Sequence, residues 1–223
     1  MDAIAAVSGA DVYVYTGVFL ILVFAVVFHE VAHGFVAYLN GDPTAKMEGR
    51  LSLNPLAHLD PIGSVVVPLL TYYILKFPFG WARPVPVNPL NYRRRVLGDI
   101  TVSLGGVTAN FLFALALGAL YHIAPRGSLN EAVLSVGIVL NCALFTFNLI
   151  PIPPLDGSHI FKYFLPKSLR LPYIRIGAFG FFILMLFMYV LQRHIAVGGG
   201  FGLIGYPVRV VLFLTGHGWG GGM

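Results

Sequence analysis

The sequence predicts an all-α polytopic membrane protein with about four to six transmembrane or re-entrant helices. Of its 223 residues, 57% are hydrophobic and only 10% are charged, and the mean hydropathy is +0.82. An average soluble domain has about 25% charged residues, and a soluble chain of this size could not bury so much apolar surface. The apolar residues form long continuous runs and not many short alternating strands, which excludes a membrane β-barrel.

Four apolar runs are long enough to cross a bilayer as helices. They are Val12–Leu39, Ile100–Ile123, Ala132–Ile150 and Tyr173–Leu191. Two aspartates but no lysine or arginine precede the first run. It therefore lacks the basic region of a cleavable signal peptide and is expected to remain as a spanning helix. A fifth run, Ile62–Phe77, has 16 residues and is interrupted by Pro68, which makes it short for a full crossing.

The segments between the apolar runs are short and polar. Gly49–Leu53 alternates polar and apolar residues in the manner of a short strand, and Asp156–Leu165 resembles a short amphipathic helix. We expect a single transmembrane domain over residues 1–223, with its core at about 12–192 and a glycine-rich tail at 198–223. No loop is long enough to hold a soluble accessory domain.

The first apolar run contains the pattern H-E-x-x-H, formed by His29, Glu30 and His33. Residues four apart share one face of a helix, so both imidazoles can reach one metal ion. Glu30 lies beside them, where its carboxylate can take a proton from an activated water. Because ionisable groups inside an apolar span are costly, three of them together indicate a functional site. Zinc suits this ligand set, with one Zn²⁺ ion per chain.

Two histidines leave a catalytic zinc site incomplete, so a third protein ligand is expected elsewhere. Asp156 is the candidate, because its carboxylate lies just past the end of the Ala132–Ile150 run in a proline-rich segment. The prolines break the helix, and broken helices at membrane depth are found where they line a cavity. Asp156 alone would more often be a helix N-cap, so the assignment depends on the motif around it.

These residues resemble the site-2 protease family of intramembrane metalloproteases. That family carries H-E-x-x-H on one transmembrane helix and N-x-x-P-x-P-x-L-D-G on a later one, and both are complete here, at 29–33 and 148–157. A third signature, G-P-x-x-N, is matched in part at Gly106–Asn110, where Val107 replaces the proline. The similarity runs from about residue 20 to residue 165. The chain has no room for the PDZ or CBS domains that some relatives carry, so it resembles the compact subgroup of the family.

The resemblance implies an intramembrane zinc endopeptidase. Such an enzyme hydrolyses a peptide bond within a transmembrane segment of another membrane protein, as in regulated intramembrane proteolysis. Its partners are therefore a transmembrane protein substrate and the lipid bilayer. In this interpretation the zinc ligands are His29, His33 and Asp156, the general base is Glu30, and the residues that bind substrate or stabilise the transition state are Asn110 and Asn148.

The resemblance also completes the expected fold class with a small membrane-associated β segment. Phe79–Val87 is similar to the segment that the family places between its first two motifs. A substrate helix must unwind locally before its peptide bond can be cleaved. Pairing with an edge strand near Gly49–Leu53 or Trp81–Val87 would stabilise the extended form of the substrate.

The basic residues predict how the protein is oriented in the membrane. If Ile62–Phe77 dips into the bilayer and returns, 11 of the 14 lysine and arginine residues fall on one side. The positive-inside rule makes that side cytoplasmic. The same topology brings His33 and Asp156 to one side of the bilayer. We therefore expect a multi-pass protein, in the cell membrane if the source is prokaryotic, with its active site toward the cytoplasmic face.

Two other functions remain open at this point. A metal-ion transporter would use the two histidines and Asp156 as a translocation site, but it would not need Glu30. A non-catalytic relative that binds membrane partners would have no reason to keep all four residues. The net charge of +5 does not indicate nucleic-acid binding, because the triplet Arg93–Arg95 is most simply a topology anchor.

Overall fold

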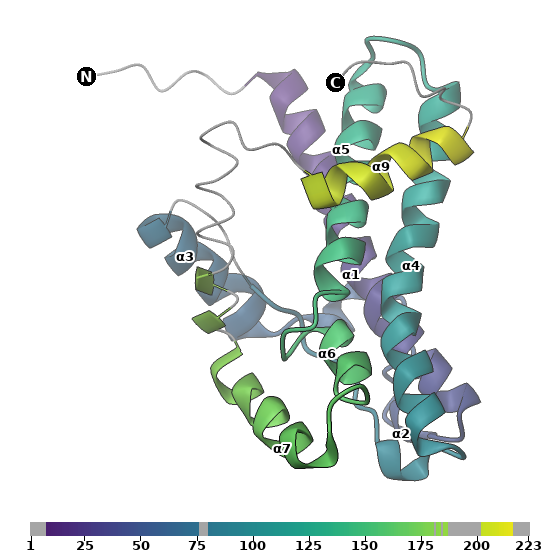
Figure 1. The fold of residues 1–223 in the computed structure, drawn as a ribbon. Coiled ribbons are helices and arrows are strands. Elements are labelled where there is room, and N and C mark those ends of the chain that lie inside the picture. The colour runs from purple at the N-terminus through teal and green to yellow at the C-terminus, as the bar shows by residue number, and fades with distance from the viewer. Residues whose placement is uncertain (1–7, 76–79, 181, 184, 187–201, 216–223) are drawn as a thin grey trace.

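A computed structural model describes residues 8–75, 80–180, 182–183, 185–186 and 202–215. This part of the chain is mostly helical (Figure 1), as predicted. Its α-helices are α1 (Gly9–Leu39), α2 (Thr44–Met47), α3 (Val67–Leu75), α4 (Arg95–Ile123), α5 (Leu129–Asn148), α6 (Asp156–Phe161), α7 (Lys167–Ile176) and α9 (Gly202–Leu214). Single turns of other helix types lie at Pro55–His58, Ile62–Val66, Pro89–Asn91 and Gly177–Phe179.

Helices α1, α4 and α5 are long and apolar enough to cross a membrane. They confirm three of the four expected spans, with ends that differ by a few residues from the predicted ones. The fourth, Tyr173–Leu191, lies only partly within the described residues, where Tyr173 belongs to α7. The chain is therefore a helical membrane protein by the length and composition of these three helices.

The three long helices pack side by side, and α4 and α5 form an antiparallel hairpin (Figure 1). Ser8 begins α1, because its hydroxyl accepts the N–H of Asp11 while the Asp11 carboxylate accepts the N–H of Ser8. Ser128 begins α5 in a similar way, by accepting the N–H of Glu131 at 3.1 Å. Gly127 makes the turn between α4 and α5, with a φ of 72° that favours glycine.

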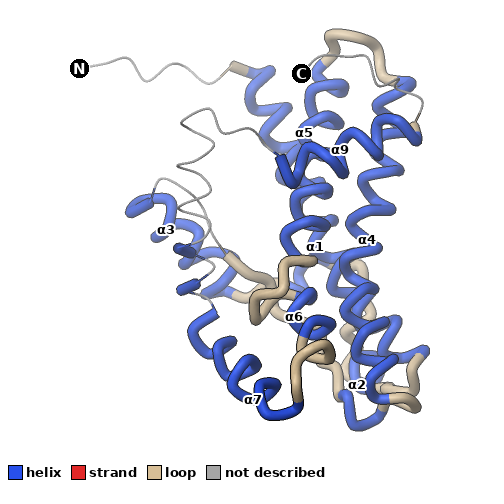
Figure 2. Tube along the Cα trace, in the orientation of Figure 1, coloured by secondary structure: helices blue, strands red, loops and turns tan. Residues whose placement is uncertain are grey.

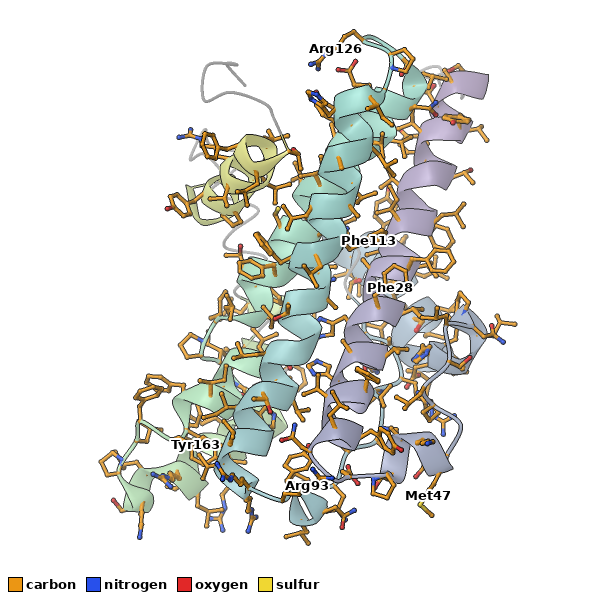
Figure 3. All side chains as sticks on the ribbon, turned by 90° about the vertical axis from the view of Figure 1, so that its right-hand side faces the viewer. Phe28, Met47, Arg93, Phe113, Arg126 and Tyr163 are labelled. Atoms are coloured by element: carbon orange, nitrogen blue, oxygen red, sulfur yellow. The ribbon has the colours of Figure 1, made fainter. Side chains whose placement is uncertain are left out.

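The core between these helices is apolar. Small and branched side chains of α4 and α5 are fully or nearly fully buried there, and they include the single cysteine, Cys142. Helix α9 crosses α4 and α5 (Figure 1) and buries Val208 and Val211 against them. Phe28 of α1 meets Phe113 of α4 edge to face, with ring centroids 5.0 Å apart (Figure 3). The 13-residue helix α9 thus packs across the bundle as part of its core.

The C-terminal end of α1, the N-terminal end of α4 and the C-terminal end of α5 lie toward the same end of the bundle (Figure 1). Figure 3 places Arg93 and Tyr163 at this end and Arg126 at the opposite one. The chain makes no net crossing between α1 and α4. This agrees with the expectation that both metal-ligand motifs lie toward one side.

The residues on either side of positions 76–79 come close together near Gly63. The N–H of Trp81 donates to the carbonyl of Gly63 at 3.0 Å. Gly80 lies so close to the same carbonyl that any side chain there would collide with it. The described ends of this segment, Gly63 and Gly80–Trp81, are therefore in direct contact.

The expected β segment is not confirmed. The described residues contain no strand (Figure 2), and Gly49–Leu53 has no ladder partner among them. Residues 80–88 run as an extended loop, while Phe79 lies outside the described residues. Pro84 and Pro86 have no N–H group to donate to a neighbouring strand, which disfavours a regular ladder.

The extended loop is held instead by contacts with three separate parts of the chain. N–H groups at alternate residues of the loop donate outward. Trp81 donates to the carbonyl of Gly63, and Arg83 donates to the carbonyl of His58. Val85 donates to the carboxylate of Glu30. The buried Arg50 guanidinium adds hydrogen bonds to the carbonyls of Arg83 and Pro84, at 3.0 and 3.4 Å. The loop is thus fixed along one edge and lies next to α1.

A buried carboxylate ties together the turns at the same end of the bundle. Asp42 is fully buried and accepts the N–H of Asn88 at 2.6 Å and the side-chain amide of Asn91 at 2.8 Å. It also accepts hydrogen bonds from the backbone and hydroxyl of Thr44. Gly41 allows the chain to turn there, with a φ of 103°.

Candidate metal centre

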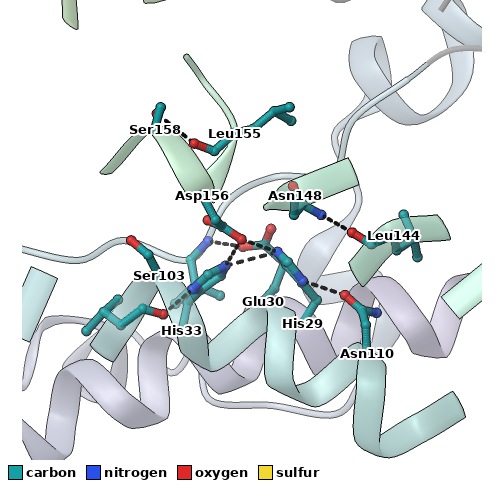
Figure 4. Close-up of polar contacts among 12 residues, drawn as sticks. His29, Glu30, His33, Ser103, Asn110, Leu144, Asn148, Leu155, Asp156 and Ser158 are labelled. Atoms are coloured by element: carbon teal, nitrogen blue, oxygen red, sulfur yellow. Dashed lines mark hydrogen bonds and ion pairs between the residues drawn. The ribbon is translucent and has the colours of Figure 1, made fainter. Parts of the chain in front are cut away.

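Helices α1 and α6 bring three ligand atoms together (Figure 4). The Nε2 atoms of His29 and His33 are 3.0 Å apart. Oδ2 of Asp156 lies 3.2 Å from Nε2 of His29 and 3.3 Å from Nε2 of His33. The three side chains are mostly buried, with 12–16% of their surface exposed. The structure thus joins the H-E-x-x-H motif to the aspartate of the second motif, as the sequence predicted.

The proline-rich turn after α5 positions Asp156. The chain turns between Asn148 and Leu155, and α6 begins at Asp156 itself. Gly157 lies so close to the carbonyl of Leu149 that a Cβ would collide with the backbone. This close approach folds α6 back against the end of α5 and points the Asp156 carboxylate at the two histidines.

The other ring nitrogen of each histidine is held by α4. Nδ1 of His29 lies 2.7 Å from the side-chain oxygen of Asn110, and Nδ1 of His33 lies 2.7 Å from the carbonyl oxygen of Val102. Both partners are acceptors, so each Nδ1 carries the proton and each Nε2 presents a lone pair. Acceptors of this kind orient imidazole ligands in metal sites.

This arrangement fits a bound cation. Two imidazole lone pairs and a carboxylate oxygen converge with no proton between them, and Oδ2 of Asp156 is a buried atom without a hydrogen-bond donor. In a tetrahedral zinc site with bonds of about 2.0 Å, the ligand atoms lie about 3.3 Å apart. The observed separations of 3.0–3.3 Å match that geometry. His29, His33 and Asp156 are the only group of three or more such ligands within the described ranges.

The carboxyl group of Asp156 is ready to bind a cation. An aspartic acid ordinarily has a pKa of about 3.9. Asp156 is therefore a carboxylate at neutral pH. A deprotonated ligand is the form that a metal ion requires.

Glu30 lies on α1 next to His29 and lines the same cleft. Its Oε2 accepts the N–H of Val85 at 2.8 Å, from the extended loop. Among the described residues no hydrogen bond reaches its second oxygen, Oε1. This position suits the predicted role of a general base, because one oxygen is fixed and the other can accept a proton.

A cleft of about 660 Å³ opens at the metal centre. One wall is the extended loop from Gly80 to Val87, and the opposite side is formed by residues of α4, α5 and α6. Asn148 lines the cleft and donates from its amide to the carbonyl of Leu144 at 3.1 Å. An amide carries two N–H donors, so the second remains to contact a substrate or an oxyanion.

Asn110 has a role that the sequence did not indicate. The prediction assigned it to substrate binding or transition-state stabilisation, together with Asn148. In the structure its oxygen contacts His29, and its amide donates to the carbonyl of Ala25 at 3.1 Å. Asn110 is fully buried, and its side-chain oxygen orients the imidazole of His29. Its polar atoms are therefore engaged before any substrate enters.

Several residues of the site were missed from the sequence. Val102 acts through its backbone carbonyl, which no side-chain pattern reveals. Asn141 of α5 is buried and lies 3.4 Å from the amide of Asn110. A polar residue inside an apolar span was the available signal for Asn141. Gly106 lies against both imidazoles, and a Cβ at this position would collide with His33 and lie 2.8 Å from the ring of His29. The partial G-P-x-x-N match included this glycine but did not indicate its purpose.

Comparison with known proteins supports the same reading of the chain. The sequence profile of peptidase family M50 matches residues 124–191. The protein named "Putative zinc metalloprotease YwhC" from Bacillus subtilis is 37% identical over 184 residues, which cover 78% of this chain and 81% of that protein.

More distant relatives come from mycobacteria. Two proteins that share the name "Putative zinc metalloprotease Rip2", from Mycolicibacterium smegmatis and Mycobacterium tuberculosis, are 31% and 33% identical. Each alignment covers 64% of this chain and 56% of the relative. No solved structure matches the chain.

Proposed function

Because the chain belongs to peptidase family M50, the site-2 protease family, we propose that it is an intramembrane zinc endopeptidase. It would cleave a peptide bond within a transmembrane segment of another protein, with one zinc ion per chain. The observation that carries this proposal is the convergence of two imidazole nitrogens and one carboxylate oxygen at 3.0–3.3 Å inside a bundle of membrane-length helices. A metalloprotease is the class that membership of the family already assigns.

The depth of the site supports cleavage inside the membrane. His33 is six residues before the end of α1, which places it about 9 Å along the helix axis from that end. Asn110 is 15 residues after the start of α4, about 22 Å along its axis. The hydrocarbon core of a bilayer is about 30 Å thick. These positions support a site that lies within the span.

The residues of the cleft account for the chemistry of hydrolysis. A zinc ion bound by His29, His33 and Asp156 would act as a Lewis acid and lower the pKa of a water molecule. The Glu30 carboxylate would take the proton from this water as it attacks the carbonyl, and then deliver the proton to the leaving amine. The free N–H of Asn148 would donate to the oxygen that gains negative charge.

The extended loop would hold the substrate in an open conformation. Helical peptide bonds are shielded by their own hydrogen bonds, so the cleaved segment must become extended before attack. Trp81, Ala82 and Val85 line the cleft from a loop whose N–H groups at alternate residues donate to other parts of the chain, as in an extended segment. Gly49–Leu53, the other expected edge, is not part of the cleft wall. We therefore assign substrate pairing to the loop at 80–87.

The charge distribution supports a cytoplasmic orientation of the active site. Ten basic residues belong to the loops and short helices beside the metal centre or to the first residue of α4: Lys46, Arg50, Arg83, Arg93, Arg94, Arg95, Lys162, Lys167, Arg170 and Arg175. The positive-inside rule places this end in the cytoplasm, and in a prokaryote the membrane would be the cell membrane.

Reconstitution tests the proposed activity. The full chain is purified in detergent, incorporated into liposomes and mixed with a single-span test substrate. We expect cleavage by the wild type, loss of cleavage with a zinc chelator, and recovery when zinc is restored. Glu30→Gln should keep wild-type zinc content but lose cleavage, because the amide cannot take up a proton.

A matched variant and a flux measurement make the test specific. Glu131→Gln removes a carboxylate from the opposite end of the bundle, where it pairs with Arg126, and should cleave as the wild type does. Cleavage that survives Glu30→Gln would contradict the mechanism. Zinc flux into the liposomes, in the absence of any cleavage, would instead identify a transporter.

A further inference from the structure

Helix α4 presents a single stripe of residues to the metal centre. Asp99, Val102, Gly106 and Asn110 are spaced by three or four residues, so they lie on one face of the helix. Asn110 orients His29, Val102 orients His33, and Gly106 leaves room for both rings. Asp99 continues this stripe toward the N-terminal end of α4. The third candidate ligand, Asp156, has no direct orienting contact with Asn110, Val102 or Gly106.

Asp99 contacts the segment that Asp156 begins. Its Oδ2 accepts the hydroxyl of Tyr163 at 2.7 Å and forms an ion pair with Nζ of Lys162. Its Oδ1 lies 3.8 Å from Nδ1 of His159. All three partners follow Asp156 within seven residues of the chain. Asp99 itself is buried, with 6% of its surface exposed.

Helix α6 needs such an anchor, because it is only six residues long. Isolated helices of this length are not stable in water, since their few hydrogen bonds do not offset the cost of nucleation. The segment after α6 turns at once toward α7, where Arg170 donates to the carbonyls of Tyr163 and Leu165. Lys162 and Tyr163 therefore lie between α6 and the turn that Arg170 stabilises.

The contacts of Asp99 are of a strong kind. A buried carboxylate that lost its partners would be costly, so the ion pair and the hydrogen bond are expected to persist. Burial and the nearby Asp99 carboxylate raise the pKa of Tyr163 to about 12, so its hydroxyl remains a donor at neutral pH. Asp99 is not part of the group of converging metal ligands in the described chain. Any effect on the metal must therefore pass through its partners.

We propose that Asp99 is the positioning residue of the third metal ligand: through Lys162 and Tyr163 it holds α6 at the register that points Asp156 toward His29 and His33. The proposal rests on the proposed function only in that the converging ligands bind a divalent metal. Helix α4 would then orient all three ligands from one stripe, two by direct contact and the third through the two side chains that follow α6.

Metal binding without any substrate tests this proposal separately from the proteolytic activity. Zinc affinity is measured by competition with a chelator on the purified full chain. We expect Asp99→Asn to weaken zinc binding about 10- to 100-fold, as loss of a partner of a metal ligand does. The visible spectrum of bound Co²⁺ should also change, because it reports the geometry of the ligands. The matched control is Glu131→Gln, which should leave both measurements unchanged.

A double-mutant cycle shows whether the effect passes through the named partner. If Asp99 acts through Lys162, then Lys162→Met should also weaken zinc binding, and the double variant should lose less than the two single effects together. If Asp99→Asn does not fold, Tyr163→Phe replaces it in the test. This variant removes only the hydroxyl that donates to Asp99, and it should also weaken zinc binding. Wild-type affinity with an unchanged Co²⁺ spectrum in the folded variant would overturn the proposal. Equal weakening by Glu131→Gln would overturn it too.

Discussion

The side-chain oxygen of Asn110 lies 2.7 Å from Nδ1 of His29. Asn110 belongs to α4 and His29 to α1, and the amide of Asn110 also reaches Ala25 of α1 and Asn141 of α5. One buried residue thus joins all three membrane-length helices at the level of the metal ligands. The side chain of Asn110 therefore contributes both to the packing of the bundle and to the tautomer of His29.

Replacing Asn110 by alanine should weaken zinc binding about 10- to 100-fold, because Nδ1 of His29 loses the acceptor that fixes its proton. Zinc competition with a chelator measures the change. Asn130→Ala is the matched control, since it removes a hydrogen bond from Tyr13 of α1 at the opposite end of the bundle. If both variants bound zinc equally well, the orienting role of Asn110 would be refuted.

Adding one methyl group at Gly106 should weaken metal binding. The Cβ of Gly106→Ala would collide with Nε2 of His33, the atom that would bind the metal. We expect at least a tenfold loss of zinc affinity, of the order seen for disturbed metal ligands. Gly205→Ala should bind zinc normally, because nothing lies within 4 Å of that Cβ. Normal zinc content in Gly106→Ala would contradict this prediction, because it would show that α1 and α4 can move apart without loss of metal binding.

Arg50 should affect the rate and leave the metal in place. Its guanidinium holds the carbonyls of Arg83 and Pro84, next to the Val85 N–H that binds Glu30. Arg50→Gln should lower kcat about 10- to 100-fold through misplacement of the general base, with wild-type zinc content. Arg50→Lys should not restore the rate, because an ammonium group lacks the planar fork of donors. An equal loss of bound zinc would mean that the whole site had collapsed.

Asp42 should stabilise the fold above acidic pH. Burial acts to raise its pKa, but hydrogen bonds from Asn88, Thr44 and Asn91 outweigh burial and lower it. A lowered pKa stabilises the folded chain above the unfolded value of about 3.9, and this contribution disappears as the pH falls through the folded value. Asp42→Asn should therefore destabilise the protein by about 1–3 kcal/mol at neutral pH.

Thermal unfolding in detergent measures this difference as a function of pH. The gap between the wild type and Asp42→Asn should be constant from neutral pH to about pH 5 and should shrink below about pH 4. Glu48→Gln changes an exposed carboxylate in the same turn and serves as the control. A gap that widened on acidification would have the wrong sign for a lowered pKa.

Much of the fold was readable from local sequence. Three spans were predicted from uninterrupted apolar runs, which are long enough as helices to cross a bilayer. The shared face of His29 and His33 followed from their spacing of four residues, which is a property of any α-helix. The β segment was not confirmed, because its hydrogen bonds go to a carboxylate and to two isolated carbonyls and not to a neighbouring strand.

The sequence by itself predicted the candidate ligands, the candidate general base and the helices that carry them, because each belongs to a local pattern. Only the tertiary structure decided how those ligands are oriented. Asn110 and His29 are 81 residues apart, and Val102 and His33 are 69 apart, so no local pattern relates them. The Asp99 contact with the segment after Asp156 is likewise long-range, at 64 residues from Asp99 to Tyr163. Such pairs exist only after α4 has packed against α1 and α6, and burial then forces each polar atom to find a partner.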